Sequence, residues 1–298
     1  MQKSNEMHRM KYEYEELSKN TRNTLPGNFI QLSDGYTHYE LDGPETGDLT
    51  VLVHGFSTPI FIWDPTYDYL LNEGFRVLRY DLYGRGYSDR PVLKYTMDLF
   101  VRQLIELVEK LELVGDKFNL IGLSMGGGIC VVFADKYPKL VNKVSLIDPI
   151  GFSMGRNILM SILKVPILNS LMMKVYLGHN RIIETQKDDF YRYGKIDEYI
   201  NKYTEQLRFK GFLRAIRSTA LNTPFTNLKE KYESLEKRKV PVQLFWGEED
   251  QTIPYETSQM VCETVPSIEF HPIKESGHIP HYTHSDEVNP LLVKFLKE

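Results

Sequence analysis

Short apolar runs alternate with longer amphipathic stretches along most of the chain. The apolar runs have strand length and are rich in β-branched residues, so we expect strands at residues 29–32, 36–41, 49–53, 75–80, 118–121, 144–147, 240–246 and 268–272. Helical patterns are expected at residues 65–72, 97–113, 127–137, 255–264 and 286–296. The first two strands form a hairpin, and the alternation that follows predicts an α/β fold with a mostly parallel central sheet and helices on both faces.

The interval 151–227 breaks this alternation, because its pattern is helical throughout and contributes no strand. An insertion after the sixth strand would stand above the carboxyl ends of the strands, where sites on such sheets lie. We therefore expect a helical cap, or lid, at 151–227 and an α/β core formed by 27–150 and 228–298. Residues 1–26 are predicted to form an exposed, charged leader with a helix over residues 7–18.

Composition narrows the classes of function. The 298 residues carry a net charge of −4, which gives no electrostatic basis for binding nucleic acid or an anionic membrane. No apolar run is long enough for stable membrane insertion. Cys130 and Cys262 lie far apart and have no metal-type spacing, so we expect neither a disulfide between them nor a metal site. No cofactor is expected. The first residues lack the apolar core of a secretory signal, and we expect a cytoplasmic protein. Nothing indicates the oligomeric state.

The segment Gly122-Leu123-Ser124-Met125-Gly126 separates an expected strand from an expected helix. A reversal this sharp strains its central residue, and small flanking residues leave room for the crowded backbone. The turn would also place the serine hydroxyl group beside backbone N–H groups at a helix N-terminus. We interpret Ser124 as a nucleophile.

A serine nucleophile needs a base and an orienting acid. His278 follows the last expected strand and is the preferred base; its neighbours His281 and His284 are expected on an exposed loop or at a helix cap. Asp250 follows the penultimate strand and is the preferred acid in the chain order serine, aspartate, histidine. Asp148 follows the strand before it and stays open as the alternative acid.

Two backbone N–H groups are expected to stabilise a developing oxyanion: those of Met125 and of Phe56, in the loop that follows the strand at 49–53. Gly55 lets that loop approach closely. His54 is expected to brace the same loop by hydrogen bonds.

With these motifs in place, the chain over nearly all of residues 28–298 resembles the α/β-hydrolase superfamily. The resemblance is carried by His54-Gly55-Phe56, by Asp81-Leu82-Tyr83-Gly84-Arg85-Gly86-Tyr87-Ser88, by the turn at Ser124, by Trp246-Gly247-Glu248-Glu249-Asp250 and by Gly277-His278. It implies the catalytic set Ser124, Asp250 and His278. The serine nucleophile argues against the haloalkane dehalogenase and epoxide hydrolase branches, whose nucleophile is an aspartate. Met125 and the helical cap look like bacterial esterases and monoacylglycerol-lipase-like members.

The favoured function is therefore a serine hydrolase that cleaves short or medium acyl esters or monoacylglycerols through an acyl-enzyme. The alternatives are a C–C bond hydrolase or perhydrolase with the same triad, and a relative that binds a ligand without catalysis. The Met and Leu content of the cap indicates an apolar acyl pocket and permits transient contact with lipid. Gly55, Phe152, Leu159 and Leu163 are the expected substrate contacts. Arg85, Asp89 and Arg90 are expected to fix their loop by local ion pairs, and binding of a substrate carboxylate is the alternative role.

Overall fold

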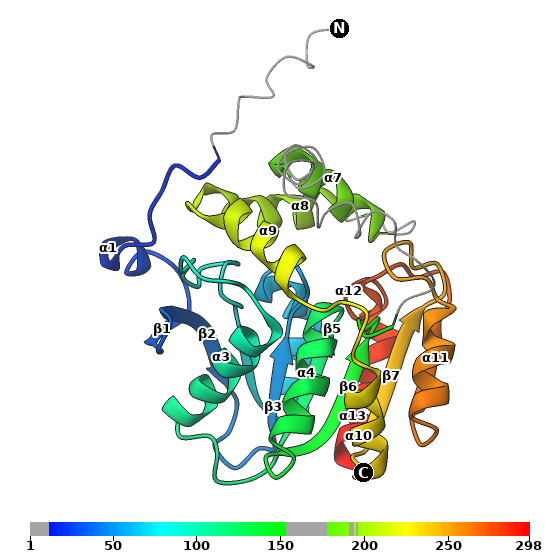
Figure 1. Cartoon of the computed structure of the whole chain (residues 1–298). Coiled ribbons are helices and arrows are strands. Elements are labelled where there is room, and N and C mark those ends of the chain that lie inside the picture. Colours follow the sequence, from blue (N-terminus) through cyan, green and yellow to red (C-terminus); the bar gives the residue numbers. More distant parts are fainter. Residues whose placement is uncertain (1–11, 153–177, 191–193, 195) are drawn as a thin grey trace, which may run out of the picture.

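The computed structural model describes residues 12–152, 178–190, 194 and 196–298. Its centre is a sheet of eight strands in the order β1-β2-β4-β3-β5-β6-β7-β8 (Figure 1). β1 pairs with β2, and β2 with β4, in antiparallel fashion, and the pairs from β4 to β8 are parallel. The predicted mostly parallel sheet is thus confirmed.

All eight predicted strands are present, with ends that differ from the prediction by up to three residues. The strands are β1 (Asn28–Gln31), β2 (Tyr36–Asp42), β3 (Leu49–Val53), β4 (Arg76–Tyr80), β5 (Phe118–Leu123), β6 (Val141–Ile147), β7 (Val242–Gly247) and β8 (Glu269–Ile273). The central strands are buried on both sides, which explains why they form continuous apolar runs in the sequence.

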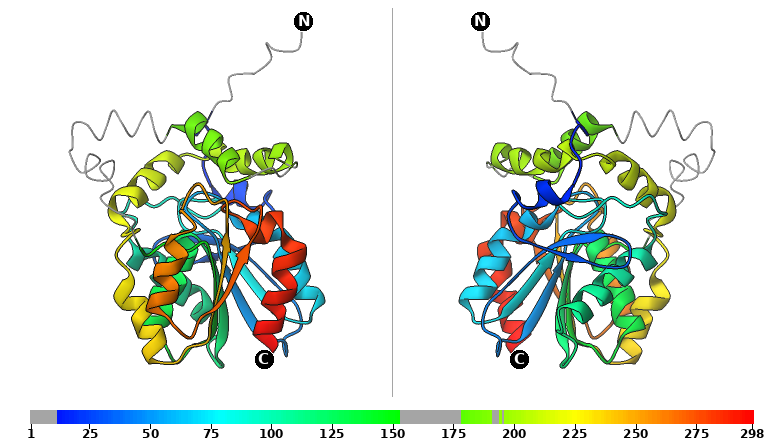
Figure 2. Two further views of the ribbon diagram at one scale, coloured as in Figure 1. Left: turned by 90° about the vertical axis from the view of Figure 1, so that its right-hand side faces the viewer. Right: turned by 90° about the vertical axis from the view of Figure 1, so that its left-hand side faces the viewer.

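Helices cover both faces of the sheet (Figure 2). One face packs against α3 (Met97–Lys110), α4 (Met125–Lys136), α10 (Lys229–Lys237) and α11 (Thr257–Thr264). The other packs against α2 (Asp64–Asn72) and α13 (Ser285–Lys297), with the short η1 (Ile60–Trp63) and α12 (Pro280–Thr283) beside them. The alternation of side chains along β3 serves both layers, because Val51 and Val53 join one apolar cluster and Leu52 joins the other.

Helix α10 was not among the predicted helices. Its nine residues are mostly charged, and only Tyr232 and Leu235 are buried. Those two side chains are enough to seat it against α4 and α11. A helix with so narrow an apolar face gives little periodic signal in the sequence.

Between β6 and β7 the described residues form α7 (His179–Asp188), α8 (Ile196–Glu205), η2 (Gln206–Arg208) and α9 (Phe212–Asn222). These helices lie over the carboxyl ends of the parallel strands (Figure 1). Their buried aromatic side chains, among them Tyr199, Tyr203 and Phe212, join the same apolar cluster as α2 and α13. The insertion therefore packs on the core at the end of the sheet where the site is expected.

The predicted helix over residues 7–18 is wrong for residues 12–18, which run without helical structure before the short α1 (Lys19–Arg22). Glu15 forms a parallel β-bridge with Phe209, and the Glu13 carboxylate accepts hydrogen bonds from the backbone N–H groups of Gly211 and Leu213. These contacts with the insertion hold the segment in place and override its local preference for a helix. Residues 7–11 of the predicted helix lie outside the described part.

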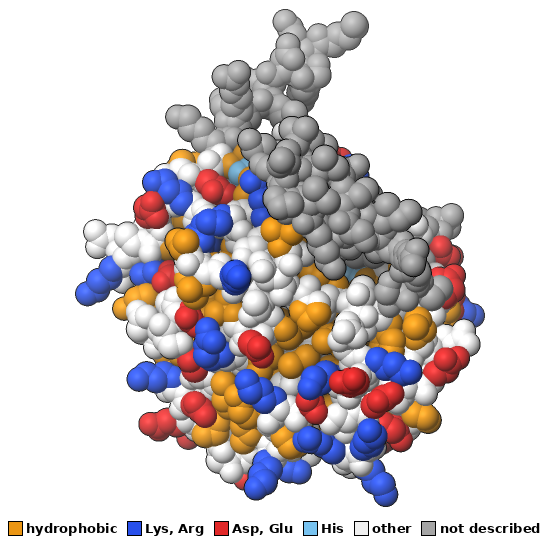
Figure 3. All heavy atoms as spheres, viewed as in Figure 1, with side chains coloured by type: hydrophobic (Ala, Val, Ile, Leu, Met, Phe, Trp, Pro, Cys, Tyr) orange, Lys and Arg blue, Asp and Glu red, His pale blue; other side chains and the backbone are white. Residues whose placement is uncertain are grey.

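On the face shown in Figure 3, Lys and Arg side chains are interspersed with Asp and Glu side chains, so neither sign of charge forms a separate patch. None of the helices in the described ranges is both long and apolar enough to cross a bilayer.

Candidate active site

Ser124 lies at the turn between β5 and α4, with φ 53° and ψ −115°. Few side chains adopt this conformation, and it is held here because the Ser124 N–H donates to the Ile147 carbonyl oxygen at 2.8 Å. Gly126 is required for space, since a Cβ atom there would lie 2.0 Å from the Val53 carbonyl oxygen. The strained turn keeps Ser124 8% exposed, on the wall of a cavity under the insertion.

His278 and Asp250 form a buried pair, of which His278 lines the same cavity. The Nδ1 atom of His278 lies 2.7 Å from Oδ2 of Asp250. Oδ1 of Asp250 accepts hydrogen bonds from the backbone N–H groups of Thr252 at 2.7 Å and Ile253 at 2.9 Å. Burial disfavours the charged imidazolium, but the Asp250 carboxylate outweighs burial, so the pKa of His278 is raised above its ordinary value. This pairing orients the ring and leaves Nε2 as the basic atom of the neutral form.

Asp148 lies directly behind this pair and is fully buried. Its Oδ1 accepts the N–H of Gly247 at 2.9 Å, and Oδ2 has no hydrogen-bond partner among the described residues. Burial, and then the nearby charge of Asp250, raise the pKa of Asp148 well above its ordinary value. Two carboxyl groups this close do not both ionise. Asp148 is therefore the neutral acid, and Asp250 is the carboxylate in contact with His278.

The expected oxyanion donors lie at the same place. Within the described residues, the Phe56 N–H makes no intramolecular hydrogen bond. Met125 begins α4, and the first N–H groups of a helix have no partner inside it. A Cβ atom on Gly55 would lie 3.4 Å from Cβ of Ser124, so the loop after β3 is in van der Waals contact with the nucleophile candidate. Two backbone donors next to a serine hydroxyl group can stabilise a negative oxygen.

His54 braces this loop, as the sequence suggests. The Leu82 N–H donates to Nε2 of His54 at 2.9 Å, so the ring proton is on Nδ1, which donates to the Gly55 carbonyl oxygen at 2.9 Å. Burial lowers the pKa of His54 to about 4 and keeps the ring neutral.

The expectation that Arg85 and Arg90 fix their loop by ion pairs is wrong. Arg90 donates to backbone carbonyl oxygens such as that of Gly86 at 2.8 Å, and no carboxylate among the described residues lies within 4.0 Å of either guanidinium group. Asp89 does form an ion pair, with Arg22 of α1. The loop is thus held mainly by hydrogen bonds from arginine side chains to backbone carbonyl oxygens. Buried carbonyl oxygens need such partners, because water cannot reach them.

The cavity at Ser124 has a volume of about 160 Å³. Its described lining is partly apolar and partly polar, and consists of Gly55, Phe56, Ser57, Thr58, Leu123, Ser124, Ile182, Thr185, Gln186, Asp189, Thr252, His278 and Ile279. This volume lies below the range of roughly 300–1,000 Å³ typical of pockets for drug-sized ligands. The cavity bounded by these residues is therefore a small one.

Of the four predicted substrate contacts, one lines the cavity at Ser124, one packs elsewhere, and two lie outside the described residues. Gly55 lines the cavity. Phe152 does not belong to its described lining, because its ring packs against that of Tyr232 in α10, with 5.1 Å between centroids. Leu159 and Leu163 lie outside the described residues. The predicted pocket roof at Phe152 is thus corrected to a packing contact with the core.

The sequence reasoning missed the residues that α7 and the turn after it bring to the cavity. Ile182, Thr185, Gln186 and Asp189 line it at spacings of three, four and seven residues. That spacing places them on one helical face, so the periodicity of the insertion could have indicated them. Gln186 also accepts hydrogen bonds from Thr58 at 2.9 Å, which joins α7 to the loop after β3.

His281 was expected on an exposed loop or at a helix cap, and that expectation is wrong. It lies on α12, is fully buried, and its ring lies 4.5 Å from the ring of Trp63. Burial, reinforced by the nearby His278, lowers the pKa of His281 to about 3. A ring that stays neutral is compatible with a position beside the base candidate.

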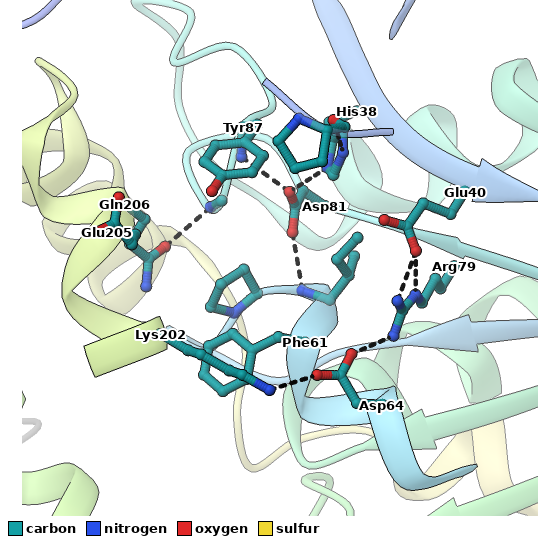
Figure 4. A pocket seen from close by; sticks show the side chains of 14 residues that line it. His38, Glu40, Phe61, Asp64, Arg79, Asp81, Tyr87, Lys202, Glu205 and Gln206 are labelled. Carbon is teal, nitrogen blue, oxygen red and sulfur yellow. Dashed lines mark hydrogen bonds and ion pairs between the residues drawn. The ribbon is translucent and has the colours of Figure 1, made fainter. Parts of the chain in front are cut away.

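A second cavity of about 210 Å³ lies between the edge of the sheet and α8 (Figure 4). Its charged side chains are paired with one another: Arg79 contacts Glu40 and Asp64, and Lys202 contacts Asp64. Asp81, also on its wall, accepts from the Ile60 N–H and pairs with the His38 ring at 2.7 Å. The contact of Lys202 with Asp64 ties α8 to the core, and the described lining of this cavity includes no serine, threonine or cysteine.

Asp148, Asp250 and His278 are also the described residues whose potential metal-ligand atoms lie within 4.8 Å of one another. Nδ1 of His278 is already bonded to Asp250, and Asp250 accepts two backbone N–H groups. These bonds suit a serine, histidine and aspartate set.

Comparison with known proteins agrees with this geometry. The profile of the Alpha/beta hydrolase family matches residues 50–291, most of the chain. The chain belongs to this family. The predicted fold and the resemblance to the α/β-hydrolase superfamily are thereby confirmed.

Individual relatives of this α/β hydrolase act in different ways. This chain is 29% identical in sequence to Lipase 3 of Moraxella sp., in an alignment that covers 79% of this chain and 73% of that protein. This chain is 25% identical to the 2-hydroxy-6-oxononadienedioate/2-hydroxy-6-oxononatrienedioate hydrolase of Paraburkholderia phymatum. That alignment covers 90% of this chain and 94% of the hydrolase. The structure of a bromoperoxidase from Bacillus anthracis superposes with a TM-score of 0.74 at 23% identity, covering 92% of this chain and 100% of that one.

Proposed function

We propose that this α/β hydrolase is a serine hydrolase that cleaves carboxylic esters through an acyl-enzyme. The observation that carries the proposal is the placement of Ser124 and His278 on the wall of one cavity, with Asp250 bonded to His278 behind that wall. The two free backbone donors beside Ser124 complete the set of groups that acyl transfer requires. A relative that only binds a ligand would not need this set.

The reaction follows from these positions. His278 takes the proton of the Ser124 hydroxyl group through Nε2 as the serine oxygen attacks the ester carbonyl carbon. The carbonyl oxygen becomes an oxyanion and accepts the N–H groups of Phe56 and Met125. When the oxyanion collapses, the bond to the alcohol oxygen breaks, and His278 gives its proton to the departing alcohol. A water molecule, deprotonated by His278, then releases the acid and restores Ser124.

The substrates that we propose are short or medium acyl esters, or monoacylglycerols. The similarity to Lipase 3 supports an ester, and the small cavity favours the short end of the range. Its mixed lining, with Leu123 and Ile182 on one hand and Thr185 and Gln186 on the other, is compatible with an acyl chain and a polar alcohol.

The same triad could serve a C–C bond hydrolase, as the Paraburkholderia relative illustrates. The name of that protein describes a dianionic substrate. Among the described lining residues Asp189 is acidic and no lysine or arginine is present. No cation in the described part of the lining would offset the two negative charges of such a substrate, which favours a neutral ester.

The test is turnover of p-nitrophenyl esters from acetate to decanoate, together with labelling by a fluorophosphonate probe. We expect turnover that is fastest with short chains, and labelling that Ser124→Ala abolishes while thermal unfolding stays cooperative. Labelling that persists in Ser124→Ala would identify another nucleophile. Absence of turnover at every chain length would exclude the esterase.

A further inference from the structure

Arg85 is fully buried in the loop between β4 and α3, and its donors reach three separate parts of the molecule. Nε donates to the Phe56 carbonyl oxygen at 2.7 Å, and Nη1 to that of Tyr83 at 3.0 Å. Nη2 donates to Oγ1 of Thr219 in α9 at 2.9 Å. All three acceptors are uncharged, so Arg85 is a buried cation that faces oxygen dipoles in place of a carboxylate.

Such an arrangement is costly unless the charge is well satisfied. Aromatic rings supply part of the compensation, because the guanidinium carbon lies 5.6 Å from the centroid of Phe56 and 5.4 Å from that of Phe100. Burial lowers the pKa of Arg85 to about 9, and the group still carries its proton at neutral pH. Only a planar fork of donors can bind three acceptors in fixed directions, which a lysine ammonium group cannot reproduce.

The first contact concerns the oxyanion donors. Arg85 binds the carbonyl group of Phe56 and also lies over its ring, so it fixes this residue through both its backbone and its side chain. The Phe56 ring is packed from the other direction by Phe225, with 5.7 Å between centroids. The backbone of Phe56 is therefore held on one side by Arg85, through its own carbonyl oxygen, and on the other by His54, through the carbonyl oxygen of Gly55.

The second contact concerns the insertion. The hydroxyl group of Thr219 donates to the Ala215 carbonyl oxygen at 2.9 Å, which leaves its oxygen lone pairs for Arg85. The helix is seated tightly on the loop: a Cβ atom on Gly84 would lie 2.4 Å from Cβ of Ala215. One side chain thus joins α9 to the residue that forms half of the oxyanion hole.

We propose that Arg85 is the positioning residue of the oxyanion hole, which it aligns through Phe56 and couples to helix α9 through Thr219. The proposal rests on the proposed function, because an oxyanion hole matters only for acyl transfer. Arg85 itself does not touch the substrate. Its loss should weaken binding of the transition state and leave binding of the ground state almost unchanged.

The experiment compares Arg85→Lys and Thr219→Val with wild type. The matched control is Arg214→Lys, since Arg214 also joins α9 to the loop after β4, but through the carbonyl oxygens of Arg90 and Pro91. For each protein we would measure kcat and KM for p-nitrophenyl acetate, and the inhibition constant of an alkyl trifluoromethyl ketone, whose serine adduct carries an oxyanion. Assays are run at least 15 °C below each melting temperature.

Removal of one oxyanion donor costs roughly 10²–10³ in kcat, so misalignment by Arg85→Lys should cost about 10- to 100-fold. KM should stay within about twofold, and ketone affinity should fall by the same factor as kcat. Thr219→Val should show a smaller loss in the same two quantities, and Arg214→Lys none.

A kcat for Arg85→Lys within twofold of wild type, or a ketone affinity that does not follow kcat, would overturn the proposal. If Arg85→Lys fails to fold, Thr219→Val decides: unchanged kcat and ketone affinity overturn the coupling to α9. A wild-type protein that neither turns over esters nor reacts with a fluorophosphonate fails the proposed function itself. An active wild type with an equally active Arg85→Lys variant fails only the role of Arg85.

Discussion

Nδ1 of His278 lies 2.7 Å from Oδ2 of Asp250, with both residues 5% exposed. Asp148 lies behind them with one oxygen on the Gly247 N–H and the other without a described partner. The two carboxyl groups therefore differ in their environment. Asp250 accepts three hydrogen bonds, whereas Asp148 accepts one, and burial beside Asp250 raises the pKa of Asp148 well above its ordinary value.

The first prediction separates the two aspartates. Asp250→Asn removes the charge that orients His278 and should lower kcat by about 10³–10⁴, as in related triads. Asp148→Asn replaces a neutral acid by a neutral amide of the same shape and should lower kcat by less than about tenfold. Steady-state kinetics with p-nitrophenyl acetate measures both. Equal losses in the two variants would show that Asp148 shares the orienting role.

The second prediction concerns the acid limb of the pH profile. His278 must be neutral to accept the serine proton, and the Asp250 carboxylate raises its pKa above the ordinary value of about 6.5. The value of kcat/KM should therefore fall as pH decreases, with a midpoint above 6.5. His281, whose pKa is lowered to about 3, remains neutral across this range. Asp189 also favours the protonated ring of His278.

A stopped assay of kcat/KM between pH 5 and 9 gives the midpoint, and Asp250→Asn should move it to lower pH. A midpoint below 6.5 in the wild type would contradict the assignment of His278 as the base.

Much of the fold and site was predictable because its signals are local. The turn at Ser124 combines a buried strand, two glycines and an apolar helix within a short segment, and each strand forms a compact apolar run. The predicted triad residues lie at strand ends, where parallel topology brings them to one edge whatever the loop lengths.

The parts that the sequence did not indicate depend on distant contacts. Phe56 and Thr219, which accept hydrogen bonds from Arg85, are 29 and 134 residues away from it in sequence. Neither contact could be inferred from the motif that contains Arg85. Residues 12–18 have a helix-favouring composition, but pairing with Phe209 overrides it. Periodicity shows which face of a segment is buried, and it does not show against which partner.

The third prediction tests the space at the nucleophile turn. A Cβ atom on Gly126 would lie 2.0 Å from the Val53 carbonyl oxygen and 2.5 Å from that of His54, and backbone atoms cannot move aside freely. Gly126→Ala should reduce the free energy of unfolding by about 1–3 kcal/mol and lower kcat, since the loop with the oxyanion donor must shift. Denaturant unfolding and ester kinetics measure the two effects.

Gly115→Ala is the matched control, because no atom lies within 4 Å of a Cβ placed there and its φ is not left-handed. This variant should unfold within about 0.5 kcal/mol of wild type. Equal stability of the two alanine variants would mean that the turn at Ser124 relaxes more easily than its contacts indicate.

The fourth prediction concerns the N-terminal segment. The Glu13 carboxylate accepts the N–H groups of Gly211 at 3.1 Å and Leu213 at 2.7 Å, where α9 begins, and lies 3.4 Å from Nε2 of His179 in α7. Glu13→Gln keeps the shape and removes the charge, so it should reduce the free energy of unfolding by about 1 kcal/mol at pH 7. Thermal unfolding followed by circular dichroism measures the difference.

The pH dependence gives the sign. Burial opposes ionisation of Glu13, but the bonds to His179 and to the two N–H groups outweigh it and lower its pKa from 4.5 to about 2. A carboxyl group whose pKa is lower in the folded state contributes stability that is complete above the unfolded value and is lost as pH falls toward the folded value. The difference between wild type and Glu13→Gln should therefore be constant from pH 8 to 5 and shrink between 4.5 and 2.

Glu16→Gln is the control, because its ion pair with Lys210 is largely exposed and should contribute less than about 0.5 kcal/mol at any pH. If Glu13→Gln and Glu16→Gln match wild type equally at pH 7, the segment does not stabilise α9. If the Glu13→Gln difference persists unchanged to pH 3, the effect arises from shape and not from charge. A difference confined to higher pH would show that the carboxylate at the start of α9 links the N-terminal segment to the helix that also contacts Arg85.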